Sequence, residues 1–147
     1  MKRIMAVWFA VWIVMSANAQ DALKKVYNEE INPIEQIDKA LVEAKAGGKH
    51  VVCQVGGNWC IWCLRFADFI TKDEAISKMV NDNFFFIHVN YNPRKPGRIG
   101  FPVLVILDAD GKVLHIQDSS FLEEGQSYSA KKVLRFFKNW TPAALKS

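Results

Sequence analysis

Two cysteines separated by two residues, Cys60 and Cys63, are the side chains of this sequence best suited to chemistry. Cysteines at this spacing can close a small disulfide ring and open it again. They follow an apolar, β-branched run at 51–55 and lead into a helical pattern at 64–70. At a helix N-terminus, unpaired backbone N–H groups and the macrodipole favour a thiolate, which is the nucleophile of disulfide exchange. The pattern therefore predicts a thiol–disulfide redox site, without naming a substrate.

The same pair has other interpretations. It could form a static structural disulfide or supply half of a metal site. A structural zinc site needs a second pair of ligands at suitable spacing, which Cys53 and the three histidines do not provide. A c-type haem needs histidine directly after the second cysteine, where this sequence has Leu64. Redox chemistry is therefore favoured over metal binding, and that chemistry needs no cofactor.

The N-terminus has the pattern of a secretory signal peptide. Two basic residues precede an uninterrupted apolar run at 4–15, and a small-residue cleavage site follows at 17–19. We expect residues 1–19 to be a signal peptide and residues 20–147 to form one domain. The apolar run is short for a membrane span of about 20 residues, so an uncleaved anchor is the less favoured alternative. Export would place the domain in an oxidising compartment, periplasmic or extracellular, where disulfides persist.

Charge and cysteine content exclude two further classes. The net charge of +4 includes two basic residues of the signal segment, so the remaining domain is only mildly basic. That bias is too weak to predict nucleic-acid binding. Three cysteines do not build a disulfide framework, and the leftover Cys53 lies in an apolar strand pattern, where it is expected to be a small buried hydrophobe.

Apolar runs bounded by turn signals predict four strands. The first two are joined through helices and should be parallel, whereas the turn at 108–111 makes the last two antiparallel. The expected strands are 51–55, 84–89, 103–107 and 112–117. The sequence thus predicts an α/β domain with a mixed central sheet flanked by helices.

Capping signals predict the helices around this sheet. They are expected to begin at Asn32, Cys60, Thr71 and Ser129; Gly47-Gly48 stops the first, and the last two end near Val80 and Trp140. The third start rests on the capping-box signature at 71–74. Residues 21–31 are either a short strand or a loop, and the segment 92–100, rich in proline and glycine, is expected to be a loop.

In these features the chain resembles the thioredoxin superfamily. The resemblance rests on Trp59-Cys60-Ile61-Trp62-Cys63 after a strand, on Gly100-Phe101-Pro102-Val103 before another, and on the order of elements from 51 to 140. The Gly-Asn-Trp-Cys-x-Trp-Cys form looks most like that of small exported bacterial thioredoxin-like proteins. The resemblance implies a thioredoxin fold and the activity of a thiol–disulfide oxidoreductase.

The resemblance also implies roles for single residues. Cys60 would be the attacking cysteine and Cys63 the resolving one. Pro102 would be cis and face the pair, although an ordinary trans proline at a strand start is the alternative. Phe101 would offer its backbone to a substrate strand.

Other residues near the pair follow or depart from the family pattern. Trp59 and Trp62 are candidates for lining a substrate groove, because apolar aromatic side chains suit peptide binding. Where thioredoxin keeps a buried Asp this chain has Gln54, which cannot ionise, and the family's buried Lys falls near His88. We expect Gln54 and His88 to form a neutral hydrogen-bonded pair, which puts general acid–base help in doubt.

The sequence therefore predicts an exported thiol–disulfide oxidoreductase that acts on disulfides or dithiols of proteins. A redox partner, for which a membrane protein is one candidate, would reset the pair. The direction of exchange depends on the reduction potential and is not fixed by the sequence. Two other classes stay open: a non-catalytic module that binds a partner protein, and a dithiol carrier of a metal such as copper(I), which soft thiolates select.

Overall fold

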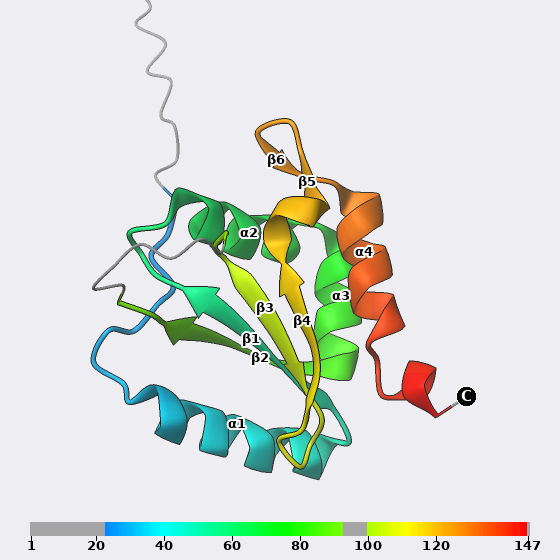
Figure 1. Ribbon diagram of the computed structural model, residues 1–147. Helices are drawn as coiled ribbons and strands as arrows, with labels where there is room; N and C mark the ends of the chain where they lie inside the picture. Colours follow the sequence, from blue (N-terminus) through cyan, green and yellow to red (C-terminus); the bar gives the residue numbers. More distant parts are fainter. Residues whose placement is uncertain (1–22, 93–99, 147) are drawn as a thin grey trace, which may run out of the picture.

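A computed structural model describes residues 23–92 and 100–146. The expected signal peptide at 1–19 and most of the expected loop at 92–100 lie outside the described residues. The described residues form a four-stranded sheet with helices on both faces (Figure 1). This is the mixed α/β architecture that the sequence predicts.

The sheet has the spatial order β2-β1-β3-β4. Its strands are β1 (His50–Gly56), β2 (Phe84–Asn90), β3 (Val103–Leu107) and β4 (Val113–Asp118). β1 and β2 are parallel, while β3 is antiparallel to both of its neighbours. The expected pairing is confirmed, and the central position of β1 brings its C-terminal end to the middle of one sheet edge.

Four α-helices pack on this sheet: α1 (Pro33–Gly47), α2 (Ile61–Lys72), α3 (Glu74–Asn83) and α4 (Ala130–Asn139). The N-cap predicted at Asn32 and the helix starts predicted at Cys60 and Ser129 are confirmed. All three residues are N-caps, and each side chain accepts a hydrogen bond from the first turn of its helix. α1 ends at Gly48, whose φ of +63° is the left-handed conformation that glycine adopts without steric cost.

The predicted boundary between α2 and α3 is wrong. Thr71 does not cap a helix; it lies within α2, and its hydroxyl donates to the carbonyl of Ala67 at 2.8 Å. The cap of α3 is Asp73, whose carboxylate accepts the N–H of Ile76 at 2.9 Å. Asp is a stronger N-cap than Thr, so the acidic residue of the signature takes this position, and α3 extends past Val80 to Asn83.

A short region between β4 and α4 was not predicted. It contains a 3-10 turn, η1 (Ser119–Leu122), and a small hairpin of β5 (Glu123–Glu124) and β6 (Ser127–Tyr128). A second 3-10 turn, η2 (Ala143–Leu145), follows α4. Residues 23–31 contain no strand, which leaves the loop alternative for that segment.

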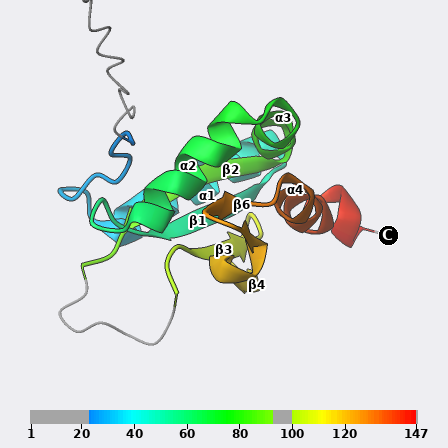
Figure 2. The ribbon, with the colours of Figure 1, turned by 90° about the horizontal axis from the view of Figure 1, so that it is seen from above.

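Two apolar cores lie on opposite faces of the sheet. Helices α2, α3 and α4 cover one face, where Phe66, Ile76 and Phe137 are fully buried. α1 covers the other face through Ala40 and Ala44, which pack against β1 and β2. Figure 2 shows α2 with α3 and α4 near one end of it. The start of α2 is thereby held over the end of β1.

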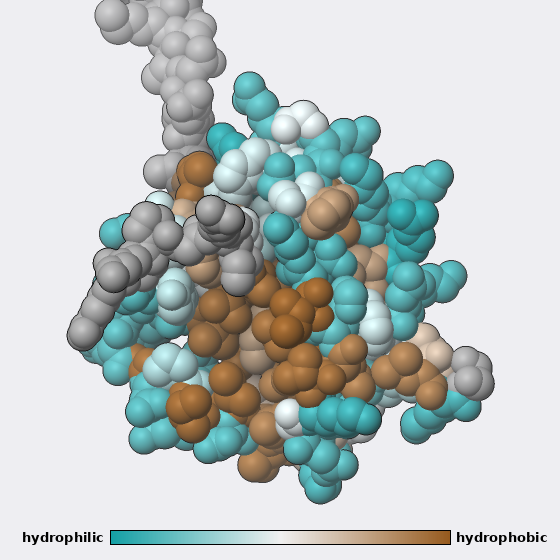
Figure 3. Space-filling view, viewed as in Figure 1, coloured by the Kyte–Doolittle hydropathy of each residue, from teal (hydrophilic) through white to brown (hydrophobic). Residues whose placement is uncertain are grey.

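α1 leaves the β3–β4 half of its face open. Val105 on β3 is only partly buried, and its partner on β4, Ile116, is 61% exposed. Figure 3 shows apolar side chains gathered over these strands. None of the helices in the described part of the chain is long and apolar enough to span a membrane.

Candidate active site

The cysteine pair lies where β1 passes through a short turn into α2. Cys60 is the N-cap of α2, and Cys63 lies in the first turn of the helix. The two form a disulfide with Cα atoms 5.2 Å apart. The Cys60 sulfur also accepts the backbone N–H of Cys63 at 3.2 Å, in the place of a capping oxygen. This N–H and the helix N-terminus favour a negative charge on the Cys60 sulfur once the disulfide is open.

The two cysteines differ in access to solvent. Cys60 retains 9% of its surface, whereas Cys63 is completely buried. Both belong to an apolar cluster with Tyr27 and Leu64. Cys60 therefore keeps a small contact with solvent and Cys63 keeps none, which suits the roles of attacking and resolving cysteine.

The segment before β3 faces the pair. The peptide bond between Phe101 and Pro102 is cis. Pro102 is fully buried, and the carbonyl oxygen of Phe101 lies 3.7 Å from the Cys60 sulfur. The structure thus brings together the two segments that are far apart in sequence and that carry the resemblance.

An aromatic cluster flanks the pair on one side. The Trp59 indole N–H donates to the carbonyl oxygen of Tyr91 at 2.9 Å, and its ring stands edge-on to Phe101 with centroids 5.4 Å apart. Tyr91 also stacks on the Phe101 ring, with centroids 5.4 Å apart. Trp59 is 51% exposed, so it presents apolar surface next to Cys60. The hydrogen bond from its indole N–H to Tyr91 fixes the orientation of the ring.

Trp62 is partly buried and packs against both the core and the cluster that holds the pair. Its ring meets Tyr128 edge to face, and the Tyr128 hydroxyl donates to the Trp62 carbonyl at 3.1 Å. The Arg65 guanidinium carbon lies 4.9 Å from the Trp62 ring centroid, a cation–π geometry. Of the two tryptophans, Trp59 is therefore the more exposed.

Gln54 lies beneath the pair, but the predicted hydrogen bond to His88 is wrong. The two residues are register neighbours on parallel strands. The Gln54 amide nitrogen donates instead to the carbonyl of Cys63 at 2.8 Å and to the hydroxyl of Tyr27 at 2.7 Å. Its amide oxygen has no partner among the described residues. The Tyr27 hydroxyl thus accepts the hydrogen bond that was expected to join Gln54 to His88. The Tyr27 ring packs against the imidazole of His88, with centroids 5.4 Å apart.

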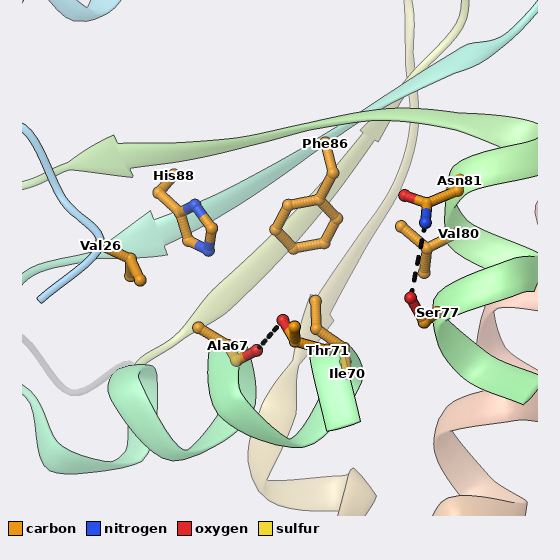
Figure 4. Close-up of a pocket in the computed structure, with 9 residues that line it drawn as sticks. All are labelled: Val26, Ala67, Ile70, Thr71, Ser77, Val80, Asn81, Phe86 and His88. Atoms are coloured by element: carbon orange, nitrogen blue, oxygen red, sulfur yellow. Dashed lines mark hydrogen bonds between the residues drawn. The ribbon is translucent and has the colours of Figure 1, made fainter. Parts of the chain in front are cut away.

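His88 borders a pocket of about 300 Å³ between β2, α2 and α3. In Figure 4 its ring lies beside Phe86 on β2 and faces the pocket. Its Nε2 atom is buried and has no hydrogen-bond partner in the described part of the chain. Burial lowers the pKa of His88 to about 4, so the ring is neutral at neutral pH.

Sequence reasoning missed two residues of the site, Tyr27 and Asn58. The Asn58 side-chain oxygen accepts the backbone N–H groups of Val26 and Tyr27, each at 3.1 Å. Its amide nitrogen donates to the carbonyl of Tyr27 at 2.8 Å. Asn58 thus ties the segment before α1 to the redox turn. The available signals were an asparagine in the Gly-Asn-Trp-Cys motif and an aromatic residue within the ambiguous segment 21–31.

Cys53 is a free, buried cysteine on β1, packed on the α1 side of the sheet. Burial raises the pKa of its thiol to about 12, so it carries almost no thiolate at neutral pH. Within residues 23–92 and 100–146, no group of three or more His, Cys, Asp or Glu side chains is placed to hold a metal ion.

Residues 37–119 match the family described as thioredoxin-like domain. The chain belongs to this family. The crystal structure of a disulphide isomerase from Xylella fastidiosa Temecula1 superposes on this thioredoxin-like chain with a TM-score of 0.67 and 22% identity, over 80% of this chain and 98% of that one. A DsbH oxidoreductase structure matches with a TM-score of 0.51 and 22% identity, over 74% and 81% of the two chains. The predicted thioredoxin fold is confirmed.

A curated relative carries a name that describes disulfide chemistry. The thiol:disulfide interchange protein DsbD of Yersinia enterocolitica is 24% identical over 68% of this chain. The thioredoxin-like chain spans only 18% of that relative's length. The match therefore involves a small part of a much longer protein.

Proposed function

We propose that the protein is an exported thiol–disulfide oxidoreductase that exchanges disulfides with protein substrates through Cys60 and Cys63. The observation that carries this proposal is the placement of the pair, with one cysteine at the N-cap of α2 and partly exposed, and the other completely buried. A static structural disulfide needs no such inequality. The names of the relatives support the same chemistry.

The reaction needs two exchanges. The Cys60 thiolate attacks one sulfur of the substrate disulfide; the substrate S–S bond breaks, and its electron pair leaves with the second substrate sulfur. Cys63 then loses its proton and attacks the Cys60 sulfur. The mixed disulfide breaks, the substrate thiolate leaves, and the Cys60–Cys63 bond closes. Run in reverse, the same steps oxidise a substrate dithiol and need no cofactor.

The substrate would lie across the aromatic surface beside Cys60. Trp62 and Phe101 pack against the cluster that holds Cys60, and Trp59 packs edge-on against Phe101, so all three offer apolar contacts near this sulfur. The backbone of Phe101, held against Cys60, would bond an extended substrate strand. Export through residues 1–19 would bring the protein to a compartment where protein disulfides form, and a redox partner would reset the pair after each cycle.

Alkylation and trapping test this proposal. Reduced protein treated with a limiting alkylating agent near neutral pH should be modified first at Cys60. The Cys63→Ser variant should accumulate mixed disulfides with a disulfide-containing protein such as insulin, because the resolving thiol is gone. The Cys60→Ser variant is the matched control and should trap none.

Two results would contradict the proposal. One is preferential alkylation of Cys63 or Cys53 in the folded protein. The other is a Cys63→Ser variant that traps no substrate. The second result together with stoichiometric copper(I) on the reduced protein would favour the metal carrier instead.

A further inference from the structure

Tyr27 reaches the resolving cysteine from a segment more than thirty residues before it in sequence. Its side chain is 5% exposed and packs in one cluster with Cys60 and Cys63. A Cβ placed on Gly56 would overlap the Cys63 sulfur and would stand 2.9 Å from the Tyr27 hydroxyl. The sulfur and the hydroxyl therefore border the same small space beside Gly56, and they can occupy it because residue 56 has no side chain.

The Tyr27 hydroxyl accepts one hydrogen bond and, within the described part of the chain, donates none. The Gln54 amide donates to its oxygen at 2.7 Å and also donates to the Cys63 carbonyl. Among the described residues, the hydroxyl itself donates to no acceptor. Since Gln54 occupies one lone pair of the phenol oxygen, the O–H is left to point elsewhere, and the space shared with the Cys63 sulfur is adjacent to it.

The position of Tyr27 is fixed at its backbone. Asn58 holds both the N–H and the C=O of Tyr27, and Asn58 itself belongs to the turn that leads into Cys60. The phenol and the cysteine pair are therefore anchored to the same turn. A hydroxyl held in this way loses little freedom when it forms one more hydrogen bond.

The resolving step creates a negative charge in this enclosed place. Among the described residues, the polar and titratable side chains grouped around Cys63 are Tyr27, Gln54 and Cys60, and the Tyr27 ring packs edge-on against His88. Within the described residues no carboxylate or cationic side chain bonds to Tyr27 or Gln54. Burial raises the pKa of Tyr27, so it stays a neutral phenol, and His88 is neutral as well. A neutral donor is what this environment offers to a thiolate.

We propose that Tyr27 is a positioning residue whose hydroxyl donates a hydrogen bond to the Cys63 sulfur while the pair is open, stabilising the thiolate that resolves the mixed disulfide. The proposal rests on the proposed function. The Cys63 proton passes to solvent, the thiolate attacks the Cys60 sulfur, and the substrate thiolate leaves. Tyr27 keeps its own proton throughout. Gln54 orients the phenol, in place of a charged group.

Stopped-flow kinetics of the reduced protein with an aromatic disulfide that releases a coloured thiolate separate the two steps. The first release depends on reagent concentration and reports attack by Cys60. The second is independent of concentration and reports resolution by Cys63. Tyr27→Phe removes the hydroxyl and keeps the ring. It should slow the second release about tenfold near neutral pH, the effect of one hydrogen bond to a charged atom, and leave the first within about twofold.

The pH dependence distinguishes this role from a merely structural one. A thiolate that loses a donor has a higher pKa, so the midpoint of the second release should move up by about one pH unit in Tyr27→Phe. Thr71→Val, which removes a hydroxyl on α2 whose bond goes to Ala67, is the control and should change neither rate nor midpoint.

Three outcomes would overturn the proposal. Equal second-phase rates and midpoints in wild type and Tyr27→Phe would show that the hydroxyl has no role. Equal slowing of both releases would show that the variant displaces the turn. A wild-type protein that releases no second thiolate would overturn the proposed function itself, and the proposal with it.

Discussion

At the scale of single residues, the site depends on a sulfur standing where helices usually place an oxygen. Cys60 caps α2 by accepting the N–H of Cys63, so the polar contact that starts the helix is made by the reacting atom. Opening the disulfide leaves this N–H in place. The same local geometry therefore begins the helix and favours the thiolate form of Cys60.

Cys53 should be dispensable for the redox chemistry. Its raised pKa leaves on the order of one thiolate in 10⁴ molecules at pH 8, and its side chain is buried on the other face of the sheet. Cys53→Ala should keep the rates of thiol release and lose about 1–2 kcal/mol of unfolding free energy. Thiol-release kinetics and denaturant unfolding measure the two effects. A loss of activity equal to that of Cys60→Ser, in a folded protein, would contradict this.

The site residues that can be predicted from the sequence are those whose residue type and local motif already indicate their role. Cys60, Cys63 and Pro102 belong to local patterns, and the structure brings them together. Tyr27 could not be found in this way, because its place in the site comes from contacts with residues far along the chain. The position of Gln54 beneath the pair is predictable, but its partner is not, because the Tyr27 hydroxyl that lies 2.7 Å from its amide nitrogen comes from a distant segment.

At the scale of elements, the Asn58 side chain makes the backbone hydrogen bonds that a neighbouring β-strand would otherwise make. It pairs with the backbone of residues 26–27 through two accepted hydrogen bonds and one donated bond, as a neighbouring strand would. The segment before α1 is thereby docked on the redox turn although it forms no strand of its own. This docking explains why residues 21–31 gave an ambiguous pattern: their order comes from another part of the chain.

Removing the Asn58 side chain should release this segment. In Asn58→Ala the amides of Val26 and Tyr27 lose their acceptor, so their hydrogen exchange should speed up at least tenfold, while amides of β1 stay unchanged. Asn58→Asp keeps the acceptor oxygens and should show intermediate protection. Hydrogen exchange followed by NMR measures each amide separately. Unchanged exchange at both positions in Asn58→Ala would show that packing alone holds the segment.

Element boundaries were predictable where one residue dominates the signal. Asn32, which is followed directly by Pro33, and Ser129 are both strong caps, and both begin helices. Between α2 and α3 two candidate caps stand two residues apart, and Asp73 prevails over Thr71. The small hairpin before α4 was missed because its strands are only two residues long, too short to show any periodicity.

At the scale of the whole molecule, His88 couples stability to pH. Its pKa is about 4 in the folded protein, below the ordinary value of 6.5. Between pH 6.5 and 4, His88 is therefore protonated in the unfolded chain but neutral in the folded protein. The stability that the neutral, buried His88 contributes above pH 6.5 is lost as the pH falls toward 4. Its loss between pH 7.5 and 4.5 amounts to about 2–3 kcal/mol.

Replacing His88 by phenylalanine should remove this dependence. Denaturant unfolding of wild type and His88→Phe at several pH values between 4.5 and 7.5 measures it. The other titrating groups are common to both proteins, so the difference between the two curves isolates His88. We expect the variant to lose less stability on acidification than the wild type. Parallel curves would mean that the imidazole is protonated without cost in the folded protein.

The tie made by Asn58 also bears on how such a protein can be divided. The family match begins at residue 37, whereas Tyr27 and its docked segment precede it. A fragment limited to the matching residues would contain Cys60 and Cys63 but would lack the Tyr27 ring that packs beneath them. In such a fragment, the side of Cys63 that Tyr27 covers would be exposed to solvent. The stretch of chain needed for an intact redox site is thus longer than the stretch that matches the family.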